Sequence, residues 1–331
     1  MKIPEISVLT SCFNATEFIE ESIESILGQS FGNFEFILID DGSTDDTLDI
    51  IRRYAAKDKR IRVVTKENSG LQKSLNLGLS LAKGDWIARF DADDVALPDR
   101  LERQWQFIKR HRDIILLGGG CLEIDKSGRH IKQHIYPMSH RGLMKRLECL
   151  GPFFPHPTAF FSRSRVQDLG GYNPRFRSSE DWDLWLRMAM VGQIGCLREP
   201  LIKLRKHEKS VTAVDSGRLT EIMGMAATVC HFRRQAGRSD PSQGDPQEWD
   251  FFVRWMEERL EAKNYFINKY SWRSLRARWY GEANAGGLGG ALSLLRLLKQ
   301  YPDILRFLKA RLGTAGLIKK LAKEFPEPHR R

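Results

Sequence analysis

The sequence predicts an α/β fold in which helices flank a mainly parallel β-sheet. Two observations up to about residue 120 support this prediction. Short apolar runs recur along the chain, and the segments between them carry apolar residues at helical spacing. Strands that alternate with helices in this way form βαβ units, whose successive strands run parallel. Ligands of such sheets bind at the carboxyl ends of the strands, so we expect the functional residues at that edge.

The expected strands are runs dominated by Ile, Val, Leu, Phe and Trp. They span residues 6–10, 34–40, 61–65, 86–90 and 114–117. The expected helices alternate with them and span residues 16–27, 45–57, 71–82 and 98–110. In the first of these helices the apolar residues fall on one stripe, which we expect to face the sheet. These residues are Ile19, Ile23, Ile26 and Leu27.

Beyond about residue 120 the parallel pattern ends. Short strands with turn signals follow, and then a helix at residues 139–150. After His207 the chain becomes helical, with a polar break at residues 239–246 that we interpret as a linker. We therefore expect a first domain over residues 1–212 and a helical C-terminal region over residues 213–331.

The net charge of +11 is concentrated at the C-terminal end. Residues 271–331 hold thirteen Lys or Arg against four Asp or Glu, which puts +9 in this tail and +2 in residues 1–270. Leucines and isoleucines alternate with basic residues in 292–299 and 304–320, a pattern that suits a basic amphipathic helix on an anionic membrane surface. A helix packed on the first domain with a solvated basic face is the alternative.

We expect a cytoplasmic protein, and the basic tail leaves open a peripheral position on the inner face of the cell membrane. No signal peptide follows Met1, and no apolar stretch approaches the roughly 20 residues of a membrane-spanning helix. The five cysteines are scattered and form no close-spaced pair. A nucleic-acid partner is not expected, because the basic tail is rich in Leu with few stacking aromatics and the strand ends are acidic.

The expected second strand ends in Asp40-Asp41-Gly42-Ser43-Thr44. Part of this run has a structural explanation, because Ser43 or Thr44 can cap the next helix and the glycine can make the turn. Capping does not explain Asp40 and Asp41, although one of them could close the turn. Both sit at a strand end, so we predict that at least one contacts a ligand, with Thr10 of the first strand as a neighbour.

The expected fourth strand runs directly into Asp91-Ala92-Asp93-Asp94, which brings three carboxylates to one edge of the sheet. Like charges this close repel one another unless a cation lies between them. Mg²⁺ or Mn²⁺ takes oxygen ligands and is commonly shared between carboxylates and substrate phosphates. A solvated acidic turn is the alternative, but the strand-end position favours a metal site.

A third acidic cluster occupies residues 179–187, Ser-Glu-Asp-Trp-Asp-Leu-Trp-Leu-Arg. Acidic residues in a first helical turn are ordinary and need no function, and Ser179 could cap a helix whose Leu184, Trp185 and Met188 face inward. The functional alternative is an acceptor pocket. In it this cluster would supply a general base, Glu180 would line the pocket, and Trp182 and Trp185 would floor a sugar site.

Taken in order, these motifs resemble glycosyltransferase family 2, an inverting family with the GT-A fold, here of the bacterial surface-polysaccharide type. The matching segments are Ser11-Cys12-Phe13-Asn14, Asp40-Asp41-Gly42-Ser43, Asn68-Ser69-Gly70, Asp91-Ala92-Asp93-Asp94, Glu180-Asp181 and residues 204–210. The resemblance covers roughly residues 4–212. It implies a Rossmann-like GT-A sheet, mainly parallel and flanked by helices, with a C-terminal helical extension.

The resemblance also implies a donor site. Thr10 and Asp41 would contact the base and ribose of a nucleotide-diphosphate sugar, with a UDP-sugar expected first. Asn14 and Asp40 belong to the same matching motifs and are placed on the donor side. Asp91 would face both the ribose and the metal.

The metal and the acidic pair also take roles from the resemblance. Asp93 would coordinate the Mn²⁺ or Mg²⁺ that bridges the diphosphate. His207 matches a position that in related enzymes completes the metal site or touches the phosphates, and a lone surface histidine is the alternative. Asp181 would take the proton from the acceptor hydroxyl.

The chain departs from the family in two places. Many members carry Ala-Arg-Asn after the glycine of the third motif, whereas here Leu75 stands in place of the arginine. Lys73 or Arg89 would then serve the phosphates. The tyrosine of the first loop is Phe13 in this chain. Neither departure touches the expected metal or base positions, so they affect donor identity.

The sequence therefore predicts a metal-dependent inverting glycosyltransferase. It would move a sugar to an acceptor hydroxyl of a bacterial surface glycan such as lipopolysaccharide, O-antigen or capsule. A lipid-linked glycan acceptor would make membrane contact useful. The alternative is a non-catalytic nucleotide-sugar or membrane-binding module, against which the retention of Asp93 and Asp181 argues.

Overall fold

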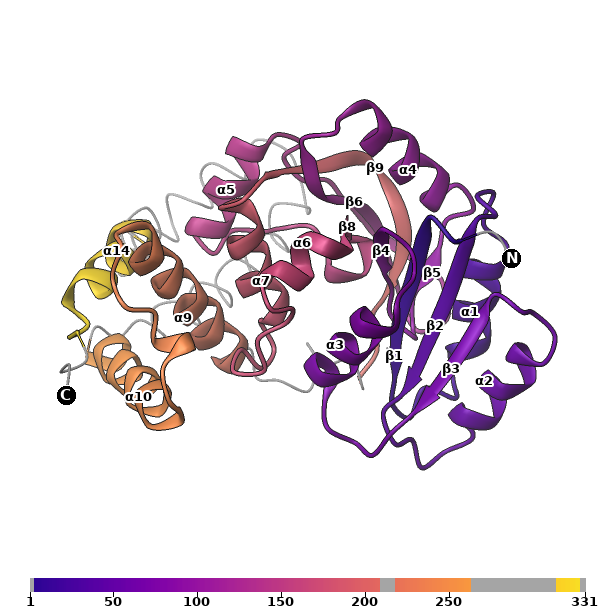
Figure 1. Ribbon diagram of the computed structural model, residues 1–331, viewed down its shortest axis with the longest axis horizontal. Coiled ribbons are helices and arrows are strands. Elements are labelled where there is room, and N and C mark those ends of the chain that lie inside the picture. Colours follow the sequence, from indigo (N-terminus) through magenta and orange to yellow (C-terminus); the bar gives the residue numbers. More distant parts are fainter. Residues whose placement is uncertain (1–2, 209–217, 263–313, 328–331) are drawn as a thin grey trace, which may run out of the picture. The chain divides into compact units, whose positions relative to one another are not determined.

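The computed structural model describes residues 3–208, 218–262 and 314–327 (Figure 1). The chain divides into two compact units, Met1–Thr220 and Glu221–Arg331. The sequence placed the end of the first domain slightly earlier, at residue 212. Each unit is described by itself below.

The first unit begins with the alternation of strands and helices that the sequence predicts. Its elements are β1 (Ile6–Cys12), α1 (Ile19–Leu27), β2 (Phe34–Asp40), α2 (Thr47–Ala55), β3 (Ile61–Thr65), α3 (Leu71–Leu81) and β4 (Trp86–Arg89). The elements that follow are β5 (Val95–Ala96), α4 (Arg100–Arg110), β6 (Ile114–Ile124), β7 (His130–His134), α5 (His140–Glu148), the 3₁₀ turn η1 (His156–Thr158), β8 (Phe160–Ser162), α6 (Arg163–Asp168), α7 (Glu180–Ala189) and β9 (Gln193–Arg205).

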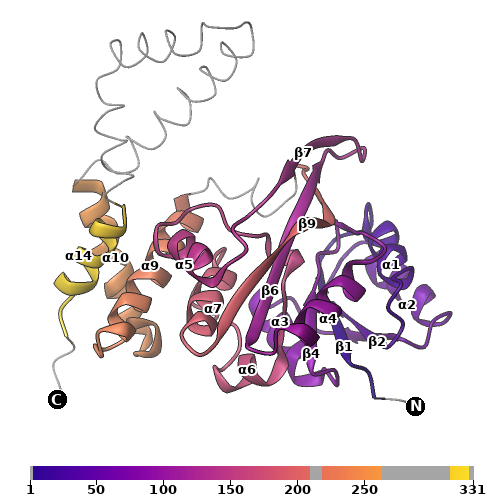
Figure 2. The ribbon, with the colours of Figure 1, turned by 90° about the horizontal axis from the view of Figure 1, so that it is seen from above.

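These strands form one sheet with the order β3-β2-β1-β4-β8-β6-β9-β5, and β7 pairs with β6 (Figures 1 and 2). β1 pairs in parallel with β2 and β4, and β2 with β3, as expected for βαβ units. β8 then lies antiparallel between β4 and β6. The second half is therefore mixed, and its long strands β6 and β9 run side by side in parallel.

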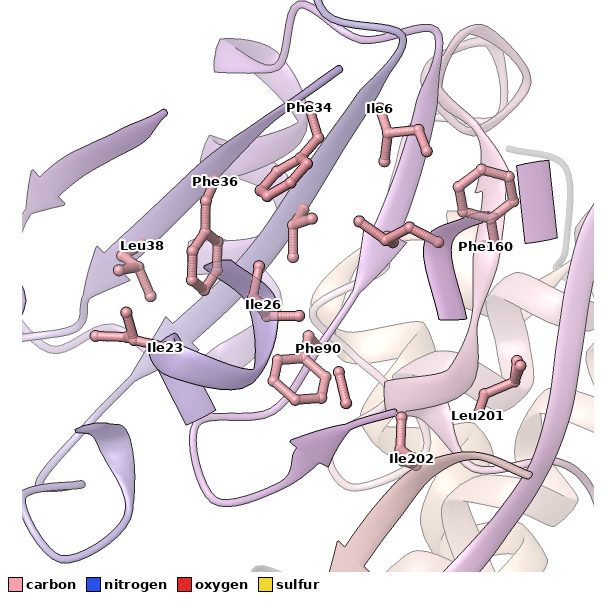
Figure 3. Packing of buried hydrophobic residues seen from close by; sticks show 14 of the residues in the cluster. Ile6, Ile23, Ile26, Phe34, Phe36, Leu38, Phe90, Phe160, Leu201 and Ile202 are labelled. Carbon is pink, nitrogen blue, oxygen red and sulfur yellow. The ribbon is translucent and has the colours of Figure 1, made fainter. Parts of the chain in front are cut away.

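The core lies where α1 packs on the sheet (Figure 3). Ile19, Ile23 and Ile26 are fully buried, so the predicted apolar stripe faces the sheet. Figure 3 shows Ile26 beside Phe36 of β2 and close to Phe90, the residue that follows β4. Burial of side chains of this size contributes roughly 1.5–3 kcal/mol each. The same packing fixes the strand ends at which the acidic motifs begin.

The sequence predicted a strand at residues 114–117, but β6 continues to Ile124. Three glycines, Gly118, Gly119 and Gly120, make this possible because they leave room for neighbouring groups. A Cβ at Gly120 would lie 2.8 Å from the carbonyl oxygen of His134 and 2.9 Å from that of Arg198. The pairing register of β6 with β9 shifts on both sides of Gly120, so this glycine sits at a bulge between two strands.

The second unit contains α10 (Pro246–Ala262), α14 (Thr314–Glu324) and most of α9 (Arg218–Gln235). Arg233 is buried and donates to the carbonyl oxygens of Ala322 at 3.1 Å and Phe325 at 2.9 Å, which fastens the end of α14 to α9. The polar segment expected as a linker contains a 3₁₀ turn, η2 (Pro241–Gln243), and its Ser242 is buried.

Residues 314–327 are the part of the expected basic tail that the structure describes. Ile318, Leu321 and Phe325 are buried within the second unit. The apolar face of α14 is thus covered by protein within this unit. Residues 263–313 lie outside the described residues. Among the helices that the structure describes, none has the length and apolar character needed to cross a bilayer.

Replacement of Gly120 tests the role of the β6 bulge. We expect Gly120→Ala to lower the free energy of unfolding by about 1–3 kcal/mol, because the new methyl group would meet backbone oxygens that cannot rotate away. Gly32→Ala is the matched control, since a Cβ there meets no atom within 4 Å and should change stability by less than about 0.5 kcal/mol. Urea denaturation of both variants measures the difference, and equal stability would contradict the bulge constraint.

Candidate functional site

The carboxyl ends of β1, β2 and β4 meet at one edge of the sheet. β1 lies between the other two strands, with Cys12 opposite Asp40 and Leu9 opposite Arg89. Thr10 is fully buried in β1, and its hydroxyl oxygen has no hydrogen-bond partner among the described residues. The three sequence motifs that end these strands are therefore neighbours, as the strand-end rule predicts.

Asp41 fastens the segment after β3 to this edge. Its carboxylate accepts the backbone N–H groups of Ser69 and Gly70, each at 3.0 Å, and contacts the ammonium of Lys66. A Cβ at Gly42 would lie 2.7 Å from the Asn68 nitrogen, so only glycine permits this approach. The structure thus brings the second and third motifs together.

Asp40 and Asp41 differ in their hydrogen bonding. Asp40 is buried, and one carboxylate oxygen accepts the Ser43 N–H at 3.4 Å. Its other oxygen has no hydrogen-bond partner among the described residues. Asp40 is therefore the aspartate that closes the turn, while one of its oxygens keeps its capacity to accept a hydrogen bond.

Asn14 holds the first loop against this turn. It has a left-handed backbone, with φ of 50°, and its side-chain oxygen accepts the Thr44 N–H at 2.8 Å. Ser43 accepts the Asn14 N–H at 3.0 Å. The expectation that Ser43 or Thr44 caps the next helix is therefore wrong. The N-cap residue of α2 is Asp46, which makes no side-chain capping bond, and the Asp45 carboxylate before it accepts the Thr47 N–H at 3.1 Å.

The carboxylates of Asp91, Asp93 and Asp94 each offer an oxygen within 4.8 Å of the others. Burial and the neighbouring negative charge raise the pKa of Asp93, and the same causes raise the pKa of Asp94 further. The ring nitrogen Nε2 of His207 lies 2.9 Å from Asp93 Oδ2. The side chain of His207 is only 10% exposed, so the interpretation of a lone surface histidine is wrong.

Strand β9 delivers His207 to this cluster. β5 pairs antiparallel with β9, with Val95 opposite Lys203, so the residues before β5 face the residues after Lys203. The ring of Phe18 packs against His207 with centroids 4.9 Å apart. No local pattern in the sequence shows that these segments meet, because more than 100 residues separate them.

Arg205 was missed by the sequence reasoning. Its backbone N–H donates to Asp94 Oδ1 at 2.9 Å, and its Nε donates to the carbonyl oxygen of Asp93 at 2.9 Å. Its guanidinium also pairs with Glu21 at 2.5 Å and lies over the ring of Phe18. The signal that could have found it is its place two residues before His207, within the matching stretch 204–210.

Arg89 lies deeper than the sequence suggested. It is 3% exposed and forms an ion pair with Asp91, so its charge is directed at the acidic edge. The same charge acts to lower the pKa of both Glu180 and Asp181. Arg89 therefore connects the strand-end cluster electrostatically with the third acidic cluster. Lys73, the other cation proposed for phosphates, is exposed on α3.

Glu180 and Asp181 open helix α7. Glu180 is buried, and desolvation together with the negative charge of Asp181 raises the pKa of its carboxyl to about 7. Asp181 is partly exposed, accepts the Trp182 N–H at 2.7 Å, and has a pKa raised mainly by burial. Ser179 is the N-cap residue of α7 as expected, but its side chain makes no capping hydrogen bond, because its hydroxyl donates to the carbonyl oxygen of Thr220 at 2.8 Å.

The two tryptophans have different environments. Trp185 is fully buried and packs between Phe154 and Phe161, so the expectation that its ring floors an acceptor pocket is wrong. The helical period explains this, because residues three or four apart share the apolar face that turns to the core. Trp182 is partly exposed, and its ring lies 6.1 Å from that of Phe153.

Comparison with known proteins agrees with this geometry. The family model "Glycosyl transferase family 2" matches residues 7–170. The putative glycosyltransferase EpsE of Bacillus subtilis strain 168 is 41% identical over 208 residues, covering 61% of this chain and 73% of that protein. The O-antigen biosynthesis glycosyltransferase WbnJ of Escherichia coli is 35% identical over 216 residues, covering 62% of this chain and 81% of WbnJ.

Solved structures show the same fold. The UDP complex of S. aureus TarS residues 1–349 superimposes with a TM-score of 0.56 at 21% identity, covering 69% of this chain and 65% of that one. The mannosyltransferase PcManGT of Pyrobaculum calidifontis, in complex with GDP-Man and Mn²⁺, gives a TM-score of 0.52 at 21% identity, covering 98% and 89% of the two chains.

The mixed sheet with its flanking helices is therefore the GT-A fold. Over the aligned residues EpsE and WbnJ are 41% and 35% identical to this chain, which spans 73% and 81% of their lengths. On this evidence the chain belongs to glycosyltransferase family 2 and is a glycosyltransferase.

Proposed function

We propose that this enzyme transfers a sugar from a nucleotide-diphosphate sugar, with a UDP-sugar first, to an acceptor hydroxyl, with inversion at the anomeric carbon. The observation that carries the proposal is the meeting of Asp91, Asp93 and Asp94 with His207 at one strand edge. A separate acidic pair at the start of α7 can serve the acceptor. Both features lie in the first unit, to which we assign donor binding and catalysis.

The residues at the strand edge fit a divalent metal. Three carboxylates within 4.8 Å of one another repel, and a buried oxygen of Asp94 has no hydrogen-bond partner in the described part of the chain. Carboxylate oxygens with one imidazole nitrogen are ligands that Mn²⁺ and Mg²⁺ accept. Asp91, Asp93 and His207 would hold the ion. When bound, it would offset the negative charge of the leaving nucleotide diphosphate.

Buried oxygen atoms that lack a hydrogen-bond partner among the described residues support the proposed site for the sugar donor. The Thr10 hydroxyl and one oxygen of Asp40 are buried without a partner among the described residues, and Asp41 lies beside them. We assign the base and ribose to Thr10, Asp40 and Asp41, with Asn14 shaping the loop. TarS is described with UDP and UDP-GlcNAc and PcManGT with GDP-Man, which supports a nucleotide-sugar donor.

Basic side chains are the candidates for contacts with the diphosphate of the donor. Lys73 is exposed at the start of α3 and is the candidate that can reach a diphosphate. Arg89 is engaged by Asp91, so we assign it to orienting this carboxylate toward the ribose and metal. An arginine at this depth cannot leave its partner without leaving a buried charge unpaired, which costs several kcal/mol.

The chemical step is a direct displacement. Asp181 would accept the proton of the acceptor hydroxyl while that oxygen forms a bond to the anomeric carbon and the carbon–oxygen bond to the diphosphate breaks. Entry of the acceptor opposite the leaving group inverts the configuration. Glu180 and the partly exposed Trp182 would border the acceptor.

The acceptor class is inferred from the relatives. WbnJ is named for O-antigen biosynthesis, and AmsE of Erwinia amylovora, 30% identical over 203 residues, for amylovoran biosynthesis. We propose that this chain acts in bacterial surface glycan synthesis, on a glycan or lipid-linked glycan. Contact with an anionic membrane surface through residues 271–331, from the cytoplasmic side, remains part of the proposal.

A donor panel tests the reaction. Incubation with UDP- and GDP-sugars and Mn²⁺ should give slow hydrolysis or transfer with one donor, and EDTA should abolish it, because the metal is needed to offset leaving-group charge. Product nucleotide is measured by chromatography. If no nucleotide sugar binds in calorimetry, with or without metal, the proposed function is wrong.

Two substitutions separate the metal and the base. Asp93→Ala should weaken metal-dependent donor binding at least tenfold, since one ligand is lost, by an amount on the order of 1.4 kcal/mol or more. Asp181→Asn should leave donor affinity within about twofold and reduce kcat by roughly 10²–10⁴-fold. Calorimetry and steady-state rates give both quantities. Equal losses of donor affinity in the two variants would contradict the assigned roles.

The pH profile tests the environment of Asp181. The base must be ionised, and burial raises its pKa above the usual value near 4, so kcat should fall with decreasing pH along a limb that lies above that value. The residual rate of Asp181→Asn should lack this limb. Nucleotide binding measured over the same pH range serves as the control. A limb at the position of an ordinary aspartate would contradict the buried-base interpretation.

A further inference from the structure

Gln72 connects helix α3 to the acidic pair. Its side-chain amide Nε2 donates to Glu180 Oε2 at 3.1 Å and lies 3.5 Å from the carbonyl oxygen of Phe176. Gln72 is the second residue of α3 and is partly buried.

The start of α3 is also held by the turn around Asp41, here called the donor turn. Gly70 is the N-cap of the helix, and its N–H donates to Asp41 Oδ2 at 3.0 Å. Its φ of 92° is a conformation that glycine adopts at little cost. Only one residue separates Gly70 from Gln72. One short segment is thus bonded both to the aspartate assigned to the nucleotide and to the neighbour of the assigned base.

The rest of α3 is fixed against the segment that leads to Glu180. Asn76 donates to the carbonyl oxygen of Tyr172 and accepts its N–H, both at 2.8 Å. Gln167 donates to the carbonyl oxygen of Leu79 at 3.2 Å. A Cβ at Gly171 would clash with Asn76 Oδ1, so the two segments are in close contact. A displacement of α3 would therefore be passed to the start of α7.

Glu180 is held from its other side by a buried histidine. His156 Nδ1 lies 3.7 Å from Glu180 Oε1, and His156 Nε2 lies 2.8 Å from the hydroxyl of Tyr172. Burial lowers the pKa of His156 and raises that of Tyr172, so both are neutral at pH 7. In the tautomer whose ring proton is on Nδ1, the Tyr172 hydroxyl donates to Nε2 and the ring proton faces Glu180.

We infer that Gln72 is a positioning residue: it holds Glu180 and thereby sets the orientation and local charge of Asp181, and it links this pair to the donor turn at Asp41. The inference rests on the proposed function. Glu180 accepts the Gln72 amide on one side and has His156 Nδ1 at 3.7 Å on the other, whereas Asp181 beside it is partly exposed. Movement of the donor turn on nucleotide binding would reach the base through a single helical turn.

Gln72→Leu removes the amide at similar volume. We expect kcat to fall about tenfold, since a hydrogen bond to a charged group is lost, while donor affinity stays within about twofold. Ser80→Ala, on the exposed face of the same helix, is the matched control and should change neither quantity. Equal melting temperatures for the three proteins establish that the fold is intact. An unchanged kcat in Gln72→Leu overturns the inference.

The pH profile gives a readout that a merely structural contact would not move. The groups that face Glu180 are Asp181, His156, Tyr172 and Arg89. The Gln72 amide favours the ionised form of Glu180, so its loss raises the pKa of this carboxyl. A protonated Glu180 does not repel the carboxylate of Asp181, which lowers the pKa of Asp181. The acid limb of kcat should therefore move to lower pH in Gln72→Leu. A limb that stays in place would contradict the positioning role.

An exchange of the side chains of Gln72 and Glu180 tests whether restoring their contact restores kcat. Gln72→Glu sets a second carboxylate against Glu180 and should reduce kcat more than Gln72→Leu does. The double variant Gln72→Glu with Glu180→Gln restores an amide–carboxylate contact with donor and acceptor exchanged, and kcat should recover severalfold over Gln72→Glu alone. Absence of recovery overturns the inference. A wild-type protein that turns over no nucleotide sugar would instead contradict the proposed function.

Discussion

Repulsion among the three carboxylates after β4 is the constraint on which the rest of the site depends. Their oxygens lie within 4.8 Å of one another at a partly buried edge, where unpaired charge is costly. Each has its own partner. Asp91 pairs with Arg89, Asp93 with His207, and Asp94 with the backbone N–H of Arg205. This arrangement also gives Asp94 a part in the site, because it anchors β9 to the loop that carries the other two aspartates.

These partners explain the mixed second half of the sheet. In a purely parallel sheet this edge would hold only strand ends and helices, and no strand would bring basic residues to it. β5 and β9 pair antiparallel directly after the acidic loop, and this pairing brings Arg205 and His207 to it. β6 pairs with β9 as far as Arg205, with a bulge at Gly120, so this pairing helps to place His207 beside Asp93.

The cost of burying charge also determines the environment of the third acidic cluster. Glu180 lies in a pocket of protein where its carboxyl has a pKa near 7, and Gln72, His156 and the charge of Arg89 surround it. Arg89 acts on Asp91 and on the acidic pair together. The edge proposed for the donor and the helix end proposed for the acceptor therefore share one buried cation, and α3 provides a second connection between them through backbone and side-chain hydrogen bonds.

The sequence by itself determined the parallel first half of the fold and the positions of its acidic strand ends. Apolar period and local turn residues are properties of short segments, so 34–40 and 86–90 could be recognised as strands without any contact being known. It did not determine that Asn14 holds the first loop against the turn after β2. The tertiary structure alone decided the pairing of Asp93 with His207 and of Gln72 with Glu180, because each joins residues more than 100 positions apart and no local pattern records which segments meet.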